Sequence, residues 1–213
     1  AEDRKSGKLK NIEPDSKSQV TFEYIDGKPV KVKSVVISSQ HSKDVNQTQV
    51  IDLLRPYISK LFPIKSTFLT GESYVETWSR IINSAYASYQ SLINKNDKET
   101  YLLYMKFSLQ IERIHALQQM CKILEFMGLS YYDIINNFGS NDKLKISLYN
   151  EHSNVFSYYI LTALFLNNYF FFLVWCAKNN SNIFNFSKTK GTVDEFKKFI
   201  ETQYHDPTLR KSI

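Results

Sequence analysis

Two kinds of hydrophobic periodicity divide the chain. In residues 18–39, apolar side chains alternate with polar ones, and Asp26-Gly27 lies between the two alternating runs. Alternation with a period of two is typical of a half-buried strand, and an Asp-Gly pair favours a tight turn, so this segment predicts a short antiparallel β-hairpin. Beyond it the apolar spacing changes to three and four residues, which predicts a helix that Pro56 interrupts or kinks and Pro63 closes.

From residue 73 the pattern is purely helical. Ser73 with Glu76, and Thr192 with Glu195, have the spacing of a capping box, so each pair predicts the first turn of a helix. Between them, one apolar stripe predicts a long helix with this face in the core. The stripe consists of Leu103, Phe107, Ile111, Ile114, Leu117, Cys121 and Leu124, and Gly128 is placed to cap the C-terminus of the helix.

The most apolar segment, Val155–Cys176, runs for 22 residues without a charge. That length could cross a bilayer. Asn167 and Asn168 lie inside it, and polar side chains are costly in lipid unless they find partners. We therefore expect a single buried core helix, with a membrane span through Val155–Cys176 as the alternative.

These patterns predict an α+β fold, in which a short antiparallel β-hairpin and a helix are followed by a mainly α-helical block. We place the boundary so that residues 1–63 form the hairpin and helix segment and residues 64–213 form the helical domain. The chain has 43% hydrophobic and 23% charged residues, a globular composition. Its two cysteines, Cys121 and Cys176, lie in apolar helical patterns without a CxxC spacing, which favours a reducing compartment and a cytoplasmic protein.

Charge narrows the function classes only slightly. The formal net charge is +6, and the first ten residues are polar and charged, so we do not expect a signal peptide there. A surplus of this size is typical of a solvated surface, and no RNP motif, zinc-finger spacing or basic heptad region accompanies it. We therefore do not expect a nucleic-acid partner.

The helical block contains few residues in patterns that support catalysis or metal binding. Glu112 and His115 stand three residues apart, a spacing that binds di-iron only when a second helix carries the same pair. We interpret this single pair as a polar helix face. We assign no catalytic residue and no metal ligand.

The polar stretch Pro14–Tyr24 (PDSKSQVTFEY) is the most informative in the chain. A lysine at the mouth of a strand can meet a phosphate as a point charge, and a neighbouring carboxylate can accept a hydrogen bond from a ribose. Together with DGKPVKV (Asp26–Val32) and SVVISSQHSKDV (Ser34–Val45), this stretch resembles the start of the central domain of S-adenosylmethionine synthetases. The resemblance runs from about residue 1 to Pro63.

The resemblance implies that Asp15, Ser16 and Lys17 are nucleotide contacts, because the Asp-x-Lys of this motif contributes to an ATP site across a dimer interface in that family. ATP and Mg²⁺ are the implied cofactors, and a protein partner or a homo-oligomer is the implied assembly. His41 matches the family's QH turn, and we interpret it as structural. Past Pro63 we find no counterpart of the family's glycine-rich region around the triphosphate, and its catalytic domain is also absent from these residues.

We therefore predict a protein related to S-adenosylmethionine synthetase, with a partial ATP site, catalytically incomplete alone and acting with a partner. Two alternatives stay open. One is a helical protein-protein interaction module in which the synthetase-like segment is only structural. The other is a membrane-associated protein anchored by residues 155–176.

Overall fold

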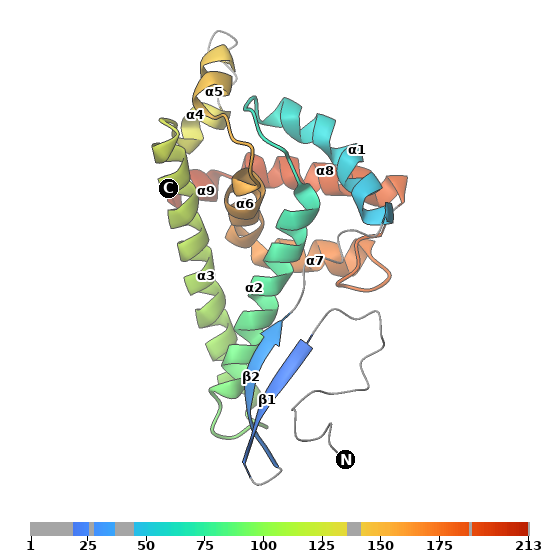
Figure 1. Cartoon of the computed structure of the whole chain (residues 1–213), viewed down its shortest axis with the longest axis vertical. Helices are drawn as coiled ribbons and strands as arrows, with labels where there is room; N and C mark the ends of the chain where they lie inside the picture. Colours follow the sequence, from blue (N-terminus) through green and yellow to red (C-terminus); the bar gives the residue numbers. More distant parts are fainter. Residues whose placement is uncertain (1–18, 26–27, 37–44, 136–141, 188, 213) are drawn as a thin grey trace. The chain divides into compact units, whose positions relative to one another are not determined.

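The computed structural model describes residues 19–25, 28–36, 45–135, 142–187 and 189–212 (Figure 1). Contacts divide the chain into two compact units, Ala1–Asp44 and Val45–Ile213. In the first unit, strand β1 (Gln19–Ile25) pairs antiparallel with strand β2 (Lys28–Val36). The division falls before the first helix, so that helix belongs by contacts to the second unit.

Helices form every regular element that is described in the second unit. They are α1 (Val45–Leu61), α2 (Thr70–Gln90), α3 (Lys98–Phe126), α4 (Tyr131–Ile135), α5 (Asp142–Leu148), the π-helix η3 (Phe156–Leu161), α6 (Thr162–Asn167), α7 (Tyr169–Asn179), α8 (Lys190–Tyr204) and α9 (Pro207–Ser212). Between residues 45 and 212, leaving out 136–141 and 188, the only strand-like pairing is a single bridge between Lys65 and Asn150.

The predicted α+β class is therefore wrong. The hydrophobic core, as far as its side chains are described, is built from helices and the loops between them. A pair of strands without a third strand gives no sheet layer on which helices could build a core. The fold class of the packed part of the chain is all-α.

The centre of the core is the continuous run of η3 and α6. Phe156, Ile160, Leu164 and Phe165 of this run are all fully buried. The helices α2, α3 and α8 surround it, and α1 packs on α2 and α8 (Figure 1). The segment with the strongest apolar character in the sequence therefore supplies the middle of a helical bundle.

The link between α1 and α2 is joined to the segment before η3. Lys65 N donates to Tyr149 O at 3.0 Å, and Glu151 N donates to Lys65 O at 3.0 Å. The Glu151 carboxylate, 7% exposed, accepts hydrogen bonds from two hydroxyls and two backbone amides. These donors are Ser66 Oγ (2.6 Å), Ser153 Oγ (2.7 Å), Val155 N (3.1 Å) and Phe156 N (3.0 Å).

Both predicted capping boxes are wrong. Helix α2 begins at Thr70, one turn before Ser73, and the buried Ser73 hydroxyl donates to Ser157 O at 2.8 Å. Helix α8 begins at Lys190, and its N-cap is Thr189, whose side chain accepts from Thr192 N. In both places the expected cap residue lies inside the helix, because a hydroxyl can also bond across the bundle or within the first turn.

The expected single helix over residues 155–176 is broken. It comprises η3, α6 and α7, and the axis bends by 90° between Phe156–Asn167 and Tyr169–Asn179. Asn168 stands at the bend with φ −123° and ψ 53°, outside the helical region. No single described helix is long and apolar enough to cross a membrane, although the bent pair meets the length and composition criteria together.

The predicted core stripe of α3 is only half right. Leu117 and Leu124, in the C-terminal half, are buried. From Leu103 to Ile114, four residues at helical spacing are exposed, and we call them the α3 stripe. They are Leu103 (63% exposed), Phe107 (67%), Ile111 (50%) and Ile114 (51%). The N-terminal half of α3 instead buries Leu109 and half-buries Met105, which lie on another face of the helix.

Candidate functional site

The residues that the sequence predicts as nucleotide contacts, Asp15, Ser16 and Lys17, lie outside the described residues. His41 also lies outside them. The described part of the chain nevertheless contains four polar or apolar features that could carry function: a charged network, two buried asparagines, a groove and the α3 stripe.

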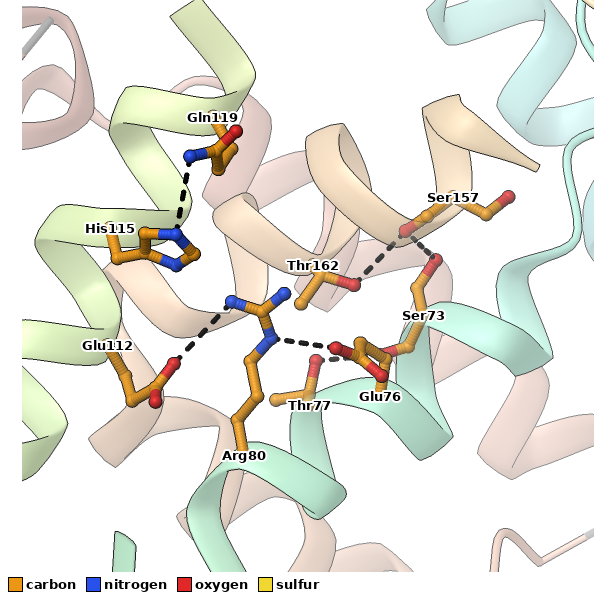
Figure 2. A network of polar contacts seen from close by, with 9 residues as sticks. All are labelled: Ser73, Glu76, Thr77, Arg80, Glu112, His115, Gln119, Ser157 and Thr162. Atoms are coloured by element: carbon orange, nitrogen blue, oxygen red, sulfur yellow. Dashed lines mark hydrogen bonds and ion pairs between the residues drawn. The ribbon is translucent and has the colours of Figure 1, made fainter. Parts of the chain in front are cut away.

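The charged network joins α2 to α3 (Figure 2). Arg80 Nε lies 2.8 Å from Glu76 Oε1, and Arg80 Nη1 lies 3.5 Å from Glu112 Oε2. The Arg80 side chain is 16% exposed, whereas the two carboxylates are 27% and 34% exposed. Arg80 therefore links α2 to α3 through its ion pair with Glu112, and the partial exposure of the charges keeps the contribution of this pair to stability small.

His115 does not join Glu112 in a common site. Its Nε2 atom lies 3.3 Å from Gln119 Nε2 on the same helix, while the Glu112 carboxylate turns toward Arg80 (Figure 2). No group of three or more His, Cys, Asp or Glu side chains that could hold a metal ion occurs within the ranges that the structure describes. This pair therefore gives no support for a di-iron site.

The same view shows the hydrogen bonds to one carbonyl group of η3. Ser157 O accepts from Ser73 Oγ at 2.8 Å and from Thr162 Oγ1 at 3.1 Å (Figure 2). A π-helical turn frees carbonyl groups from the regular ladder, and hydroxyls of α2 and α6 satisfy this one. Such turns often mark functional sites, but the Ser157 side chain is at 0% exposure here, so this residue is not open to a ligand.

The two asparagines at the bend have charged and polar partners from α3, from α8 and from the link between α8 and α9. Arg113 of α3 donates to Asn167 Oδ1 at 2.9 and 3.1 Å. The Asn168 amide donates to Gln203 Oε1 at 2.8 Å and to the Asp206 carboxylate. These partners explain how two amides are tolerated inside an apolar segment, and they assign both asparagines to the bend.

The two cysteines have the properties of core residues. Cys176 is fully buried, its Sγ lies 3.4 Å from Tyr74 Oη, and burial raises the pKa of its thiol to about 11. Burial also raises the pKa of Cys121, which is half-buried. Because the thiolate is the reactive form, neither side chain is an activated nucleophile.

A groove of about 960 Å³ lies between α7 and α8. Its apolar lining includes Phe171, Val174 and Phe199, and its polar lining includes charges of both signs, Lys198 and Glu201 among them. This size is at the upper end of small-molecule sites. Balanced charge gives no preference for an anionic or a cationic ligand.

The sequence missed the exposure of the α3 stripe, because periodicity shows that a helix has an apolar face but not what covers that face. A contiguous apolar face in water is typical of a contact surface. This is the feature that the interaction-module hypothesis requires.

The N-terminal end of the chain is similar to known proteins. Residues 1–85 match the model of the S-adenosylmethionine synthetase central domain. The S-adenosylmethionine synthase of Pelagibacter ubique is 78% identical over 65 residues, which are 30% of this chain and 17% of that protein. The enzyme of Paramagnetospirillum magneticum is 48% identical over 82 residues, which are 38% of this chain and 21% of that protein.

The chain spans about a fifth of the length of the curated relatives that it matches. The match includes α1 and ends inside α2, further along than Pro63. No solved structure matches the chain.

Proposed function

Because residues 1–85 are related to the central domain of S-adenosylmethionine synthetases, we propose that this segment keeps part of an ATP site. Asp15, Ser16 and Lys17 contact the nucleotide, with Lys17 as a point charge near the phosphates. The observation that carries the proposal is the family match, which includes all three residues.

The chain is catalytically incomplete alone and acts with a protein partner in the cytoplasm. Transfer of an adenosyl group releases triphosphate, whose charge must be neutralised by Mg²⁺ and several cations. The resemblance assigns a single cation, Lys17, to that task. A partner subunit would supply the remaining cations and the Mg²⁺ ligands.

Titration calorimetry of Mg²⁺-ATP into the full chain tests the nucleotide contact. Replacement Lys17→Ala removes a charged hydrogen bond and should weaken binding by about 1–3 kcal/mol, which corresponds to roughly 5- to 150-fold in Kd. Lys10→Ala, which removes a lysine outside the Pro14–Tyr24 motif, is the matched control and should leave Kd within twofold. Absence of ATP binding by the folded chain, or equal losses in both variants, would contradict the proposal.

A separate assay tests whether the chain is catalytically incomplete alone. The chain with ATP, Mg²⁺ and methionine should form no S-adenosylmethionine above the rate of a heat-denatured sample. Synthesis by the chain alone would contradict incompleteness while leaving the nucleotide site in place, so the two parts of the proposal can fail separately.

A further inference from the structure

We propose that the α3 stripe is a homodimer contact, in which the stripe of one copy packs antiparallel against the stripe of a second copy. The inference goes beyond the proposed function, because a second copy carries the same residues and cannot supply the cations and Mg²⁺ ligands that a partner subunit would bring. It does not depend on the ATP site.

The shape of the stripe fits another helix. Leu103, Phe107, Ile111 and Ile114 complete three turns in eleven residues, so they form a nearly straight apolar line about 16 Å long on α3. A straight line of side chains at this spacing packs along a second helix of equal length. Among the described side chains, no other helix exposes four large apolar residues at this spacing.

The area is sufficient for a specific but weak contact. The four side chains, with the neighbouring Tyr104 at 39% exposure, leave on the order of 500 Å² of apolar surface in water. Two copies would together cover about 1,000 Å², which is the lower limit of specific interfaces, so we expect dissociation in the micromolar range. The exposed rim residues include both Glu99 and Lys106, a mixture that does not favour an anionic lipid surface.

The direction follows from what α3 already contacts. Its C-terminal half buries Ala116, Leu117 and Met120, and α3 packs on α6 and η3. In Figure 1 the end of α3 that carries Lys98 points away from α4 and α5, within the same unit. An antiparallel pair therefore places the two bundles at opposite ends, sets Leu103 opposite Ile114 of the second copy, and opposes the two helix dipoles.

Sedimentation velocity of the full chain between 1 and 200 µM tests the contact. The natural chain should shift from monomer to dimer over this range. Phe107→Glu places a charge in the pair and should raise the dimer Kd at least 100-fold. Phe170→Glu, at a 65% exposed phenylalanine of α7, is the matched control and should leave Kd within threefold.

Circular dichroism checks that both variants keep the helical content of the natural chain. A monomer at every concentration, or a dimer that Phe170→Glu rather than Phe107→Glu abolishes, would overturn the proposal. Loss of binding to phosphatidylserine vesicles by Phe107→Glu, with the natural chain monomeric, would assign the stripe to lipid and also overturn it. In each of these cases the ATP titration still tests the nucleotide site separately.

Disulfide trapping tests the direction. In a Cys121→Ser background, a Leu103→Cys sample mixed with an Ile114→Cys sample should form the mixed disulfide faster than either sample alone forms its own. Faster self-linking of each sample would show a parallel pair and overturn the antiparallel arrangement.

Discussion

Two phenylalanines of the helical unit, Phe165 of α6 and Phe107 of α3, have opposite surroundings. Phe165 is fully buried, and its ring stacks on Phe172 at 5.8 Å and contacts Phe196 and Phe199 at 5.6 and 5.8 Å between ring centroids. Phe107 is 67% exposed. The same residue type therefore stabilises the monomer in one place and leaves a surface for association in the other.

The two regions also differ in what surrounds their side chains. Beside η3, the buried Glu151 carboxylate has hydrogen-bond partners, since an unpaired charge there would cost stability. On the α3 stripe, the four apolar side chains are at least half exposed. Mutations on the η3–α6 side should therefore change the free energy of unfolding, whereas mutations on the stripe should change the oligomeric state.

The largest contrast should come from truncating each phenylalanine to alanine. Phe165→Ala leaves a cavity among three aromatic rings and should lower the free energy of unfolding by about 3–5 kcal/mol. Phe107→Ala should change it by less than about 0.5 kcal/mol when measured below the dimerisation range. Urea unfolding followed by circular dichroism gives both values. Equal losses in the two variants would show that Phe107 is part of the monomer core.

A smaller effect should follow from removing the Glu151 carboxylate. Glu151→Ala leaves two backbone amides and two hydroxyls without their acceptor, at the junction between the α1–α2 link and η3. Because these groups are only partly reached by water, we expect a loss of about 2–3 kcal/mol in the same unfolding assay. Glu125→Ala, at an exposed glutamate of α3, is the control and should stay within about 0.5 kcal/mol. A loss as small as that of the control would mean that water replaces the carboxylate.

Local sequence signals predicted the C-terminal cap of α3 correctly, but they did not predict contacts between distant helices. Gly128 was predicted to cap α3, and it does so with φ +71°, a conformation that glycine adopts without strain. The capping boxes at Ser73 and Thr192 could not be distinguished from hydroxyls inside a helix, because the Ser73 partner, Ser157, is 84 residues away. Long-range partners of this kind are not encoded in local spacing.

The bend at Asn168 shows the same limit. An apolar run of 22 residues predicts one helix, and only the positions of Gln203 and Asp206 explain why the amide leaves the helical path. Of the candidate site, the sequence proposed Asp15, Ser16 and Lys17, which lie outside the described residues and remain predictions. The sequence predicted the α3 stripe as an apolar helix face but wrongly placed this face in the core. Helical periodicity is the same for a core and for a contact surface.

The smallest of the three effects should occur at the boundary between the buried α6 and the half-exposed α7. Burial raises the pKa of the Asp206 carboxyl, but hydrogen bonds from Thr208 and Asn168 outweigh it and hold the pKa below its usual value. A lowered pKa in the folded state contributes stability above the ordinary carboxyl value of about 4, and this contribution is lost as the pH falls. Asn168→Ala should therefore cost about 1 kcal/mol at pH 7.

The pH profile distinguishes this role from simple packing. Asn168→Ala removes one of the bonds that lower the Asp206 pKa, so the difference in unfolding free energy from the natural chain should shrink between pH 6 and pH 3. Asn182→Ala, which removes an exposed amide oxygen that accepts from Phe184 N, should cost less than about 0.5 kcal/mol with no pH dependence. A difference that stays constant with pH would mean that Asn168 holds the bend through Gln203 and not through the Asp206 carboxylate.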